Sequence, residues 1–237
     1  MYKDKIVLIT GASRGVGLDV THYFLKNNAI VIGLSRGTSG INDDNYHHYE
    51  VDLSQPDEIV SIFRVIAKNH KRVDIVINNA AVLTSQYSMI MPLKNAVDMV
   101  NVDFLAVFLV SREAAKLMRK NSYGRIINIS SMAASLEPIG DSLYAACKVG
   151  INTLANVMAK EFASMNITCN TVAITAIETD MLHQHSPVAQ VKIKEIIKNL
   201  PIARMAVIDD ILNVIDFYSS ERSSYVTAQI VYLGGIN

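Results

Sequence analysis

Short apolar runs alternate along the chain with longer segments of helical periodicity. Seven runs predict buried strands, at Lys5–Thr10, Ile30–Leu34, His48–Val51, Val73–Asn78, Arg125–Ser130, Thr168–Val172 and Ile230–Leu233. Between them, apolar residues recur at helical spacing in segments such as Val16–Lys26, Pro56–Asn69, Ala96–Lys120 and Tyr144–Ser164. Apolar strands separated by helices are typical of a parallel sheet covered on both faces. We therefore expect an α/β fold: one doubly wound Rossmann domain with a seven-stranded parallel sheet flanked by helices on both faces.

The length of 237 residues suits one domain over residues 1–237, since no repeat or linker divides the chain. One segment, about 174–204, departs from the alternation. It follows a strand, is polar in its middle and ends at Leu200-Pro201. We expect it to form a lid over the site, with a short helix near Val188–Asn199.

Composition narrows the class of protein. Half of the residues are apolar, 19% are charged, and 22 basic residues balance 22 acidic ones, which argues against a nucleic-acid binder. Apolar stretches such as Phe104–Val110 are too short to cross a bilayer, and no signal peptide follows Lys3 and Lys5. Two cysteines make no disulfide framework, and His183 and His185 lack a third ligand. We expect a cytoplasmic protein with no metal, membrane or nucleic-acid partner.

The first predicted strand runs directly into Gly11-Ala-Ser-Arg-Gly15-Val-Gly17, after which a helix begins. Glycines permit a tight turn and let backbone N–H groups approach a pyrophosphate at the helix N-terminus. Such glycines also occur in ordinary strand–helix turns. Their place after the first strand of an alternating chain favours a phosphate-binding loop.

Tyr144 and Lys148 are four residues apart near the start of a predicted helix, so their side chains point the same way. A nearby ammonium favours the phenolate and lowers the tyrosine pKa, which suits proton transfer near neutral pH. Such a pair also occurs by chance on many helices. Ser131, at the carboxyl end of a predicted strand, adds a hydroxyl for a substrate carbonyl, although Ser130 competes for that role.

These motifs, in this order, resemble the short-chain dehydrogenase/reductase family. Thr10 and the glycine spacing come first, then Asn78-Asn-Ala-Ala81 and Val100-Asn-Val-Asp103, and then the thirteen-residue interval from Ser131 to Tyr144, which favours Ser131. The resemblance implies a catalytic tetrad of Asn101, Ser131, Tyr144 and Lys148. It implies cofactor contacts from Gly11, Ser13, Arg14, Val16, Arg36, Asp52, Leu53, Asn79, Tyr144, Lys148, Ile177 and Thr179. Two departures are Ile174-Thr175 in place of Pro-Gly and Ala81 in place of glycine.

In the reducing direction, the resemblance implies that Tyr144 gives a proton to the carbonyl oxygen while hydride arrives at carbon. Lys148 lowers the Tyr144 pKa and holds the nicotinamide ribose, Ser131 polarises the carbonyl, and Asn101 holds a water that links Lys148 to solvent. Asp52 would contact the adenine, and Ile177 and Thr179 the nicotinamide carboxamide.

Two arginines predict NADP(H) as the cofactor. A site specific for NAD has a carboxylate at the end of the second strand for the ribose 2′-hydroxyl. Here Ser35-Arg36-Gly37 follows that strand and no acid occurs before Asp43. Arg36 and Arg14 can approach a 2′-phosphate from two sides. Either arginine alone would more simply be a solvated surface charge.

Within the family, Gly11–Gly17, Gly124–Ser130 and Ile177–Met181 resemble the β-ketoacyl-acyl-carrier-protein reductases. This implies NADPH-dependent reduction of a ketone on a carrier-bound thioester. The arginines that receive the carrier in those enzymes correspond to Ser122 and Met165 here, so Lys116, Arg119 and Lys120 would have to substitute. A reductase of a free alcohol, sugar or small ketone is the alternative, and a regulatory protein without catalysis is a third. The Met-rich stretch Met89–Met99 suits a greasy pocket and core filling equally.

Apolar residues on more than one face of the two longest predicted helices predict a homo-oligomer, most simply a tetramer. These residues include Phe104, Phe108, Leu154 and Phe162.

Overall fold

The computed structural model describes residues 2–177 and 195–235. Its centre is one parallel sheet of seven strands in the order β3-β2-β1-β4-β5-β6-β7. The strands are β1 (Ile6–Thr10), β2 (Ile30–Ser35), β3 (Tyr46–Glu50), β4 (Ile75–Asn78), β5 (Gly124–Ser131), β6 (Ile167–Ile174) and β7 (Ile230–Tyr232). The strand order changes direction between β1 and β4, which places a topological switch point there. The predicted fold class is confirmed.

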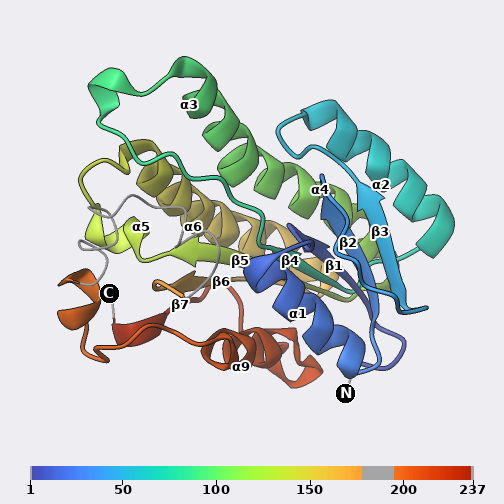
Figure 1. The fold of residues 1–237 in the computed structure, drawn as a ribbon. Helices are drawn as coiled ribbons and strands as arrows, with labels where there is room; N and C mark the ends of the chain where they lie inside the picture. Colours follow the sequence, from blue (N-terminus) through green and yellow to red (C-terminus); the bar gives the residue numbers. More distant parts are fainter. Residues whose placement is uncertain (1, 178–194, 236–237) are drawn as a thin grey trace.

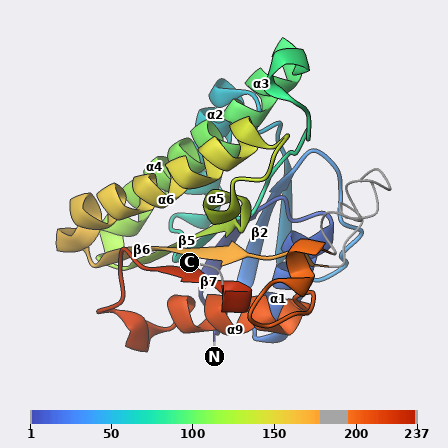
Figure 2. The same ribbon diagram turned by 90° about the vertical axis from the view of Figure 1, so that its left-hand side faces the viewer.

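Helices cover both faces of the sheet, as Figures 1 and 2 show. One face carries α1 (Gly15–Lys26) and α9 (Ile208–Ser219). The other carries α2 (Pro56–His70), α3 (Leu93–Val100), α4 (Ala106–Met118) and α6 (Ser142–Phe162), with the short α5 (Ala133–Leu136) beside them. None of the helices in the described residues is long and apolar enough to cross a membrane.

Alternation along each strand explains why the strands read as apolar throughout. In β1, Val7 and Ile9 pack into the core under α1 and α9, while Leu8 packs into the core under α2 and α4. Both faces of a parallel sheet are buried, so every position in an inner strand needs an apolar side chain. The edge strand β3 is only half-buried and has a polar sequence. The predicted strand therefore begins two residues later than the observed one.

Three further elements differ from the prediction. The predicted helix Ala96–Lys120 is interrupted by a π-helical turn, η2 (Asn101–Leu105), between α3 and α4. Helix α9 is absent from the predicted elements, although its buried Ile211 and Ile215 lie on one face. In the predicted lid, residues 195–198 are helical, and the start of the predicted Val188–Asn199 helix lies outside the described residues.

Candidate active site and cofactor cleft

A cavity of about 690 Å³ opens at the carboxyl ends of the strands, beside the switch point between β1 and β4. Most residues predicted to bind or react line it: Gly11, Ser13, Arg14, Val16, Arg36, Asp52, Leu53, Asn79, Tyr144, Lys148 and Ile177. Thr179 lies outside the described residues. Ligands of doubly wound sheets bind at this place, so the cavity is the candidate functional site.

The glycine loop after β1 needs its glycines. Gly11 has a φ of +69°, and a Cβ on Gly17 would lie 2.1 Å from the Gly11 carbonyl oxygen. The Thr10 hydroxyl accepts hydrogen bonds of 3.0 Å from the backbone N–H groups of Asn79 and Ala80, and the Asn79 amide donates to the Thr10 carbonyl at 3.0 Å. The loops after β1 and β4 are therefore clamped together. Helix α1 starts with no side-chain cap, which leaves its first N–H groups for a phosphate.

The end of the cavity beside β2 carries two arginines. Arg14 and Arg36 are both exposed, and neither forms an ion pair within residues 2–177 and 195–235. The Ser35 hydroxyl donates to the Gly37 carbonyl at 2.9 Å and fixes the turn that presents Arg36. A hydrogen bond from the Ser54 backbone N–H lowers the pKa of Asp52, burial opposes this, and Arg36 lowers it further. Asp52 therefore carries a negative charge at neutral pH.

Tyr144 and Lys148 project from the first turns of α6 into the cavity. The Lys148 Nζ lies 5.3 Å from the Tyr144 ring centroid and donates to the Ile129 carbonyl at 3.3 Å. Burial raises the pKa of Tyr144; the Lys148 ammonium lowers it, as predicted, but does not outweigh burial. The Ser131 hydroxyl also lowers the Tyr144 pKa. The phenol is accordingly protonated at neutral pH.

The two candidate serines occupy different surroundings. Ser130 is buried, and its hydroxyl donates to the Lys148 carbonyl at 3.2 Å. Ser131 is half-buried, and its oxygen accepts a hydrogen bond of 3.1 Å from the Ala133 N–H. That bond fixes the Ser131 oxygen beside Tyr144, whose pKa it lowers. Ser130 lines the cavity, whereas Ser131 is not among the lining residues in the described structure, so the predicted role of Ser131 toward the substrate stays a prediction.

Asn101 stands at the first residue of the π-helical turn. Its side-chain amide donates to the Ser54 carbonyl at 3.1 Å, which ties η2 to the loop after β3. The side chain does not line the cavity. Its predicted role in holding a water beside Lys148 stays a prediction.

Asp103, which lies two residues further along the same turn, is not among the predicted site residues. Its side chain is fully buried, and burial raises its pKa to about 6. One carboxyl oxygen accepts from the Val82 N–H at 2.8 Å, while the other has no hydrogen-bond partner in the described part of the chain. The available signal was an acid directly in front of the apolar run Phe104–Val110.

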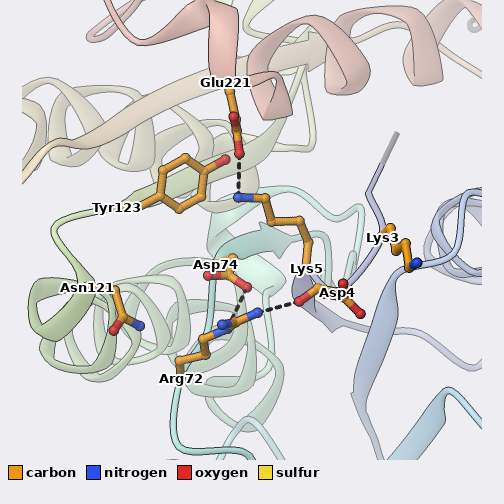
Figure 3. A pocket seen from close by; sticks show the side chains of 8 residues that line it. All are labelled: Lys3, Asp4, Lys5, Arg72, Asp74, Asn121, Tyr123 and Glu221. Atoms are coloured by element: carbon orange, nitrogen blue, oxygen red, sulfur yellow. Dashed lines mark hydrogen bonds and ion pairs between the residues drawn. The ribbon is translucent and has the colours of Figure 1, made fainter.

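A second cavity, of about 400 Å³, lies at the opposite edge of the sheet, where the strands begin (Figure 3). Four of its charged side chains form two ion pairs. Lys5 contacts Glu221 at 2.6 Å and lies 4.0 Å from the Tyr123 ring centroid, and the Arg72 Nε lies 3.2 Å from an Asp74 oxygen. These contacts connect the segments in front of β1, β4 and β5 with the segment after α9, so we assign this cavity a structural role.

Comparisons with known proteins agree with this site. The family model for short chain dehydrogenases matches residues 5–189. Over 240 residues the chain is 30% identical to the 3-oxoacyl-[acyl-carrier-protein] reductase FabG of Escherichia coli, covering 99% of this chain and 97% of that protein. FabG of Aquifex aeolicus is 30% identical over 243 residues, covering 98% and 96%.

Two solved structures share the fold at 25% identity. The aldohexose dehydrogenase of Thermoplasma acidophilum superposes with a TM-score of 0.89, covering 98% of this chain and 94% of that one. A 4-hydroxyisoleucine dehydrogenase complexed with NADH gives 0.90, covering 98% of both chains. The chain therefore belongs to the short-chain dehydrogenase family, and it is an oxidoreductase that acts on CH–OH or C=O groups.

Proposed function

We propose that this chain is an NADP(H)-dependent reductase that converts a ketone into a secondary alcohol, with a β-ketoacyl thioester as the substrate. One observation carries the proposal. The Tyr144–Lys148 pair, the glycine loop and both arginines line the same cavity. A bound nicotinamide supplies the hydride, and the protein orients the reactants and handles the proton.

The catalytic roles follow from what each side chain can donate. The Tyr144 phenol gives its proton to the carbonyl oxygen, and the burial that raises its pKa keeps that proton in place until reaction. The Ser131 hydroxyl hydrogen binds the same oxygen and stabilises the negative charge that develops there. Lys148 stabilises the phenolate that remains, because its ammonium lies beside the ring.

The preference for NADP(H) rests on Arg14 and Arg36. The end of β2 carries no carboxylate, and this is the position where an NAD site needs one for the ribose 2′-hydroxyl. Arg36 instead extends from the turn after that strand, and Arg14 from the glycine loop, onto one cavity. A 2′-phosphate between them would accept charge-assisted hydrogen bonds from both guanidinium groups. Thr179 stays a proposed contact to the nicotinamide.

Exposed apolar side chains next to the loops that follow β4 and precede α6 support an apolar substrate over a sugar. The loop after β4 is linked to the loop before α6 by hydrogen bonds from the Gln86 N–H to the Gly140 carbonyl and between Ser88 and Ser142, both 2.8 Å. Met89, Leu93 and Ile139, on or beside these loops, are 98%, 79% and 75% exposed. Such exposed apolar side chains suit an acyl chain. In the Met-rich stretch, Met99 is buried in the core, and a pocket-lining role for the other methionines stays a proposal.

The aldohexose dehydrogenase in the structural comparison keeps the alternative open: a dehydrogenase or reductase of a free alcohol, sugar or small ketone. The third possibility, a regulatory protein without catalysis, is disfavoured because Asn101, Ser131, Tyr144 and Lys148 are all present. Both cysteines are buried and unpaired, which agrees with a proposed place in the reducing cytoplasm.

A carrier protein would have few cations to bind. Lys116 pairs with Glu113 at 2.7 Å, and Arg119 and Lys120 lie between α4 and β5, where the strands begin. That edge is opposite the one that carries Tyr144.

An assay with substrates of both kinds tests the proposal. We expect acetoacetyl thioesters to be reduced with NADPH more efficiently than any free ketone or sugar, and faster when the thiol belongs to a carrier protein. Ile139→Asp should raise KM for the thioester, because it places a negative charge among the exposed apolar side chains proposed to contact the acyl chain. The matched control is Tyr225→Asp, on a fully exposed residue outside the cavity. A sugar or free ketone reduced far better than any thioester would establish the alternative.

We also propose that the chain forms a homo-oligomer, most simply a tetramer. The apolar surface patch is made of other residues than those predicted. Phe108, Leu154 and Phe162 are half-buried against the core, whereas Val149 and Val157 on α6 are 42% and 46% exposed. These valines are eight residues apart and share one helix face. That unpartnered apolar face, beside α4, is the proposed contact between subunits (Figure 1).

Sedimentation at micromolar concentration should therefore show a species larger than the monomer. Val157→Arg should shift the population toward monomer, since it places a charge in the apolar contact. Val65→Arg, on the exposed face of α2, introduces the same charge at similar exposure and should leave the assembly intact. A stable wild-type monomer would contradict the proposal.

A further inference from the structure

The interior beside Tyr144 and Lys148 contains an acid that the proposed mechanism does not use. Asp103 is fully buried in the π-helical turn η2, which packs against α6. The Val82 N–H holds one of its carboxyl oxygens at 2.8 Å, and the other is buried without a hydrogen-bond partner in the described residues. A buried carboxylate with an unused oxygen destabilises a fold, so its retention calls for an electrostatic reason.

The groups that face Asp103 come from a few elements. The titratable and charged side chains on the elements packed against it are Lys94 and Asp98 on α3, Arg112, Glu113 and Lys116 on α4, and Tyr144, Cys147, Lys148, Lys160 and Glu161 on α6. Lys160 and Glu161 lie near the other end of α6, more than three helical turns beyond Lys148. Those on α3 and α4 pair among themselves at 2.6–2.7 Å. The loop after β4 contributes the Val82 N–H. Lys148 is therefore the cation left to face Asp103.

Asp103 lies close to the reacting end of α6, because the ring of its neighbour Phe104 packs against Gly150, two residues after Lys148. Burial raises the pKa of Tyr144, Lys148 lowers it, and Asp103 raises it again. Cys147, on the same helix, shows the same balance: burial and Asp103 raise its pKa, to about 11, and Lys148 lowers it. Lys148 and Asp103 do not come within 4 Å as an ion pair in the described structure, so the two charges act on Tyr144 separately.

We propose that Asp103 is a positioning residue whose buried carboxylate keeps the reacting proton on Tyr144 against the pull of Lys148. The inference rests on the proposed role of Tyr144 as proton donor. Lys148 alone would favour the phenolate, which is the form that accepts a proton in alcohol oxidation. The opposing carboxylate favours the phenol, which is the form that donates in carbonyl reduction. Asp103 thus adds to the effect of burial and extends to higher pH the range in which Tyr144 keeps the proton that reduction needs.

The charge on Asp103 is present where it is needed. Burial raises the Asp103 pKa to about 6 and Lys148 lowers it, so the carboxyl is ionised above that pH. Tyr144 titrates in the alkaline range, where Asp103 is fully charged. Below about pH 6 the carboxyl takes up a proton and its effect on Tyr144 disappears.

Asp103→Asn tests the proposal, because asparagine keeps the oxygen that accepts from Val82 and removes the charge. We expect the alkaline pKa in the pH profile of kcat/KM to fall by about one unit, or tenfold in proton affinity, for both reaction directions. Glu137→Gln is the matched control: it removes an exposed acid just before α6, where solvent screens the charge, and should leave that pKa in place.

A second readout needs neither cofactor nor turnover. Tyrosinate absorbance is titrated in the Asp103→Asn and parent proteins, each compared with its Tyr144→Phe counterpart to isolate Tyr144. We expect the Tyr144 titration to move downward by the same amount. If the asparagine chain does not fold, Asp103→Thr offers the Val82 N–H a hydroxyl oxygen and gives the same comparison.

The outcomes separate two failures. Loss of activity in Asp103→Asn with an unmoved alkaline pKa in both readouts would show that Asp103 only supports the fold. Full turnover in Tyr144→Phe would instead overturn the proposed function. Loss of turnover in Tyr144→Phe, together with a lower Tyr144 pKa in Asp103→Asn, supports both the proposed function and the proposed role of Asp103.

Discussion

Tyr144→Phe should reduce kcat for carbonyl reduction by about 100- to 10,000-fold while cofactor affinity stays nearly unchanged. The substitution removes the hydroxyl that donates the proton and keeps the ring that fills the wall of the cavity. The Lys148 ammonium keeps its hydrogen bond to the Ile129 carbonyl, so the ribose site should survive. Steady-state rates give the loss of turnover, and a fluorescence titration with NADPH gives the affinity.

Tyr49→Phe is the control for this experiment. It removes a tyrosine hydroxyl bonded to His70 at 2.9 Å on the edge strand, outside the cavity, and should keep wild-type turnover. Equal activity of the Tyr144→Phe variant and the parent on a carbonyl substrate would remove Tyr144 from the mechanism.

Arg36→Asp should abolish or reverse the cofactor preference. For the parent we expect the specificity constant for NADPH to exceed that for NADH by at least about tenfold, or about 1.4 kcal/mol. The substitution replaces a guanidinium that pairs with the 2′-phosphate by a carboxylate that repels it. The same carboxylate can accept a hydrogen bond from the ribose 2′-hydroxyl of NADH. The ratio of the two specificity constants, measured in both proteins, reports the change.

Arg119→Asp makes the same charge change between α4 and β5 and should leave the cofactor ratio as it is, since that residue lies at the opposite edge of the sheet. Arg14→Ala should weaken the binding of NADPH without strengthening the binding of NADH, because alanine provides no acceptor for the ribose 2′-hydroxyl. A parent enzyme that prefers NADH would show that neither arginine binds the 2′-phosphate.

Local sequence determined the parts of this protein that depend on near neighbours. An inner strand such as β1 must be apolar at every position because both faces of the sheet are covered, so its run is visible without a structure. The glycine loop is set by its own φ angle and by close approach within one turn. Tyr144 and Lys148 share a face because four residues make about one helical turn. These features led to the fold class and to site residues of which most line the cavity.

Tertiary structure decided what depends on contacts between distant segments. The interval to Tyr144 favours Ser131 over Ser130 in the sequence, but only the packing of α6 against β5 shows that Ser130 is buried against the Lys148 carbonyl and that Ser131 is half-buried. The edge position of β3 leaves its residues half-buried, so the strand lacks an apolar run, and Phe108, predicted to lie in an exposed patch, packs against the core.

Asp103 shows the same division most clearly. In the sequence it is a single acid before an apolar run, and nothing local distinguishes it from a surface residue. Its burial, its bond to Val82 and its effect on Tyr144 arise only when η2, the loop after β4 and α6 come together. Electrostatic fields depend on distances in space and on desolvation, and the folded chain sets both.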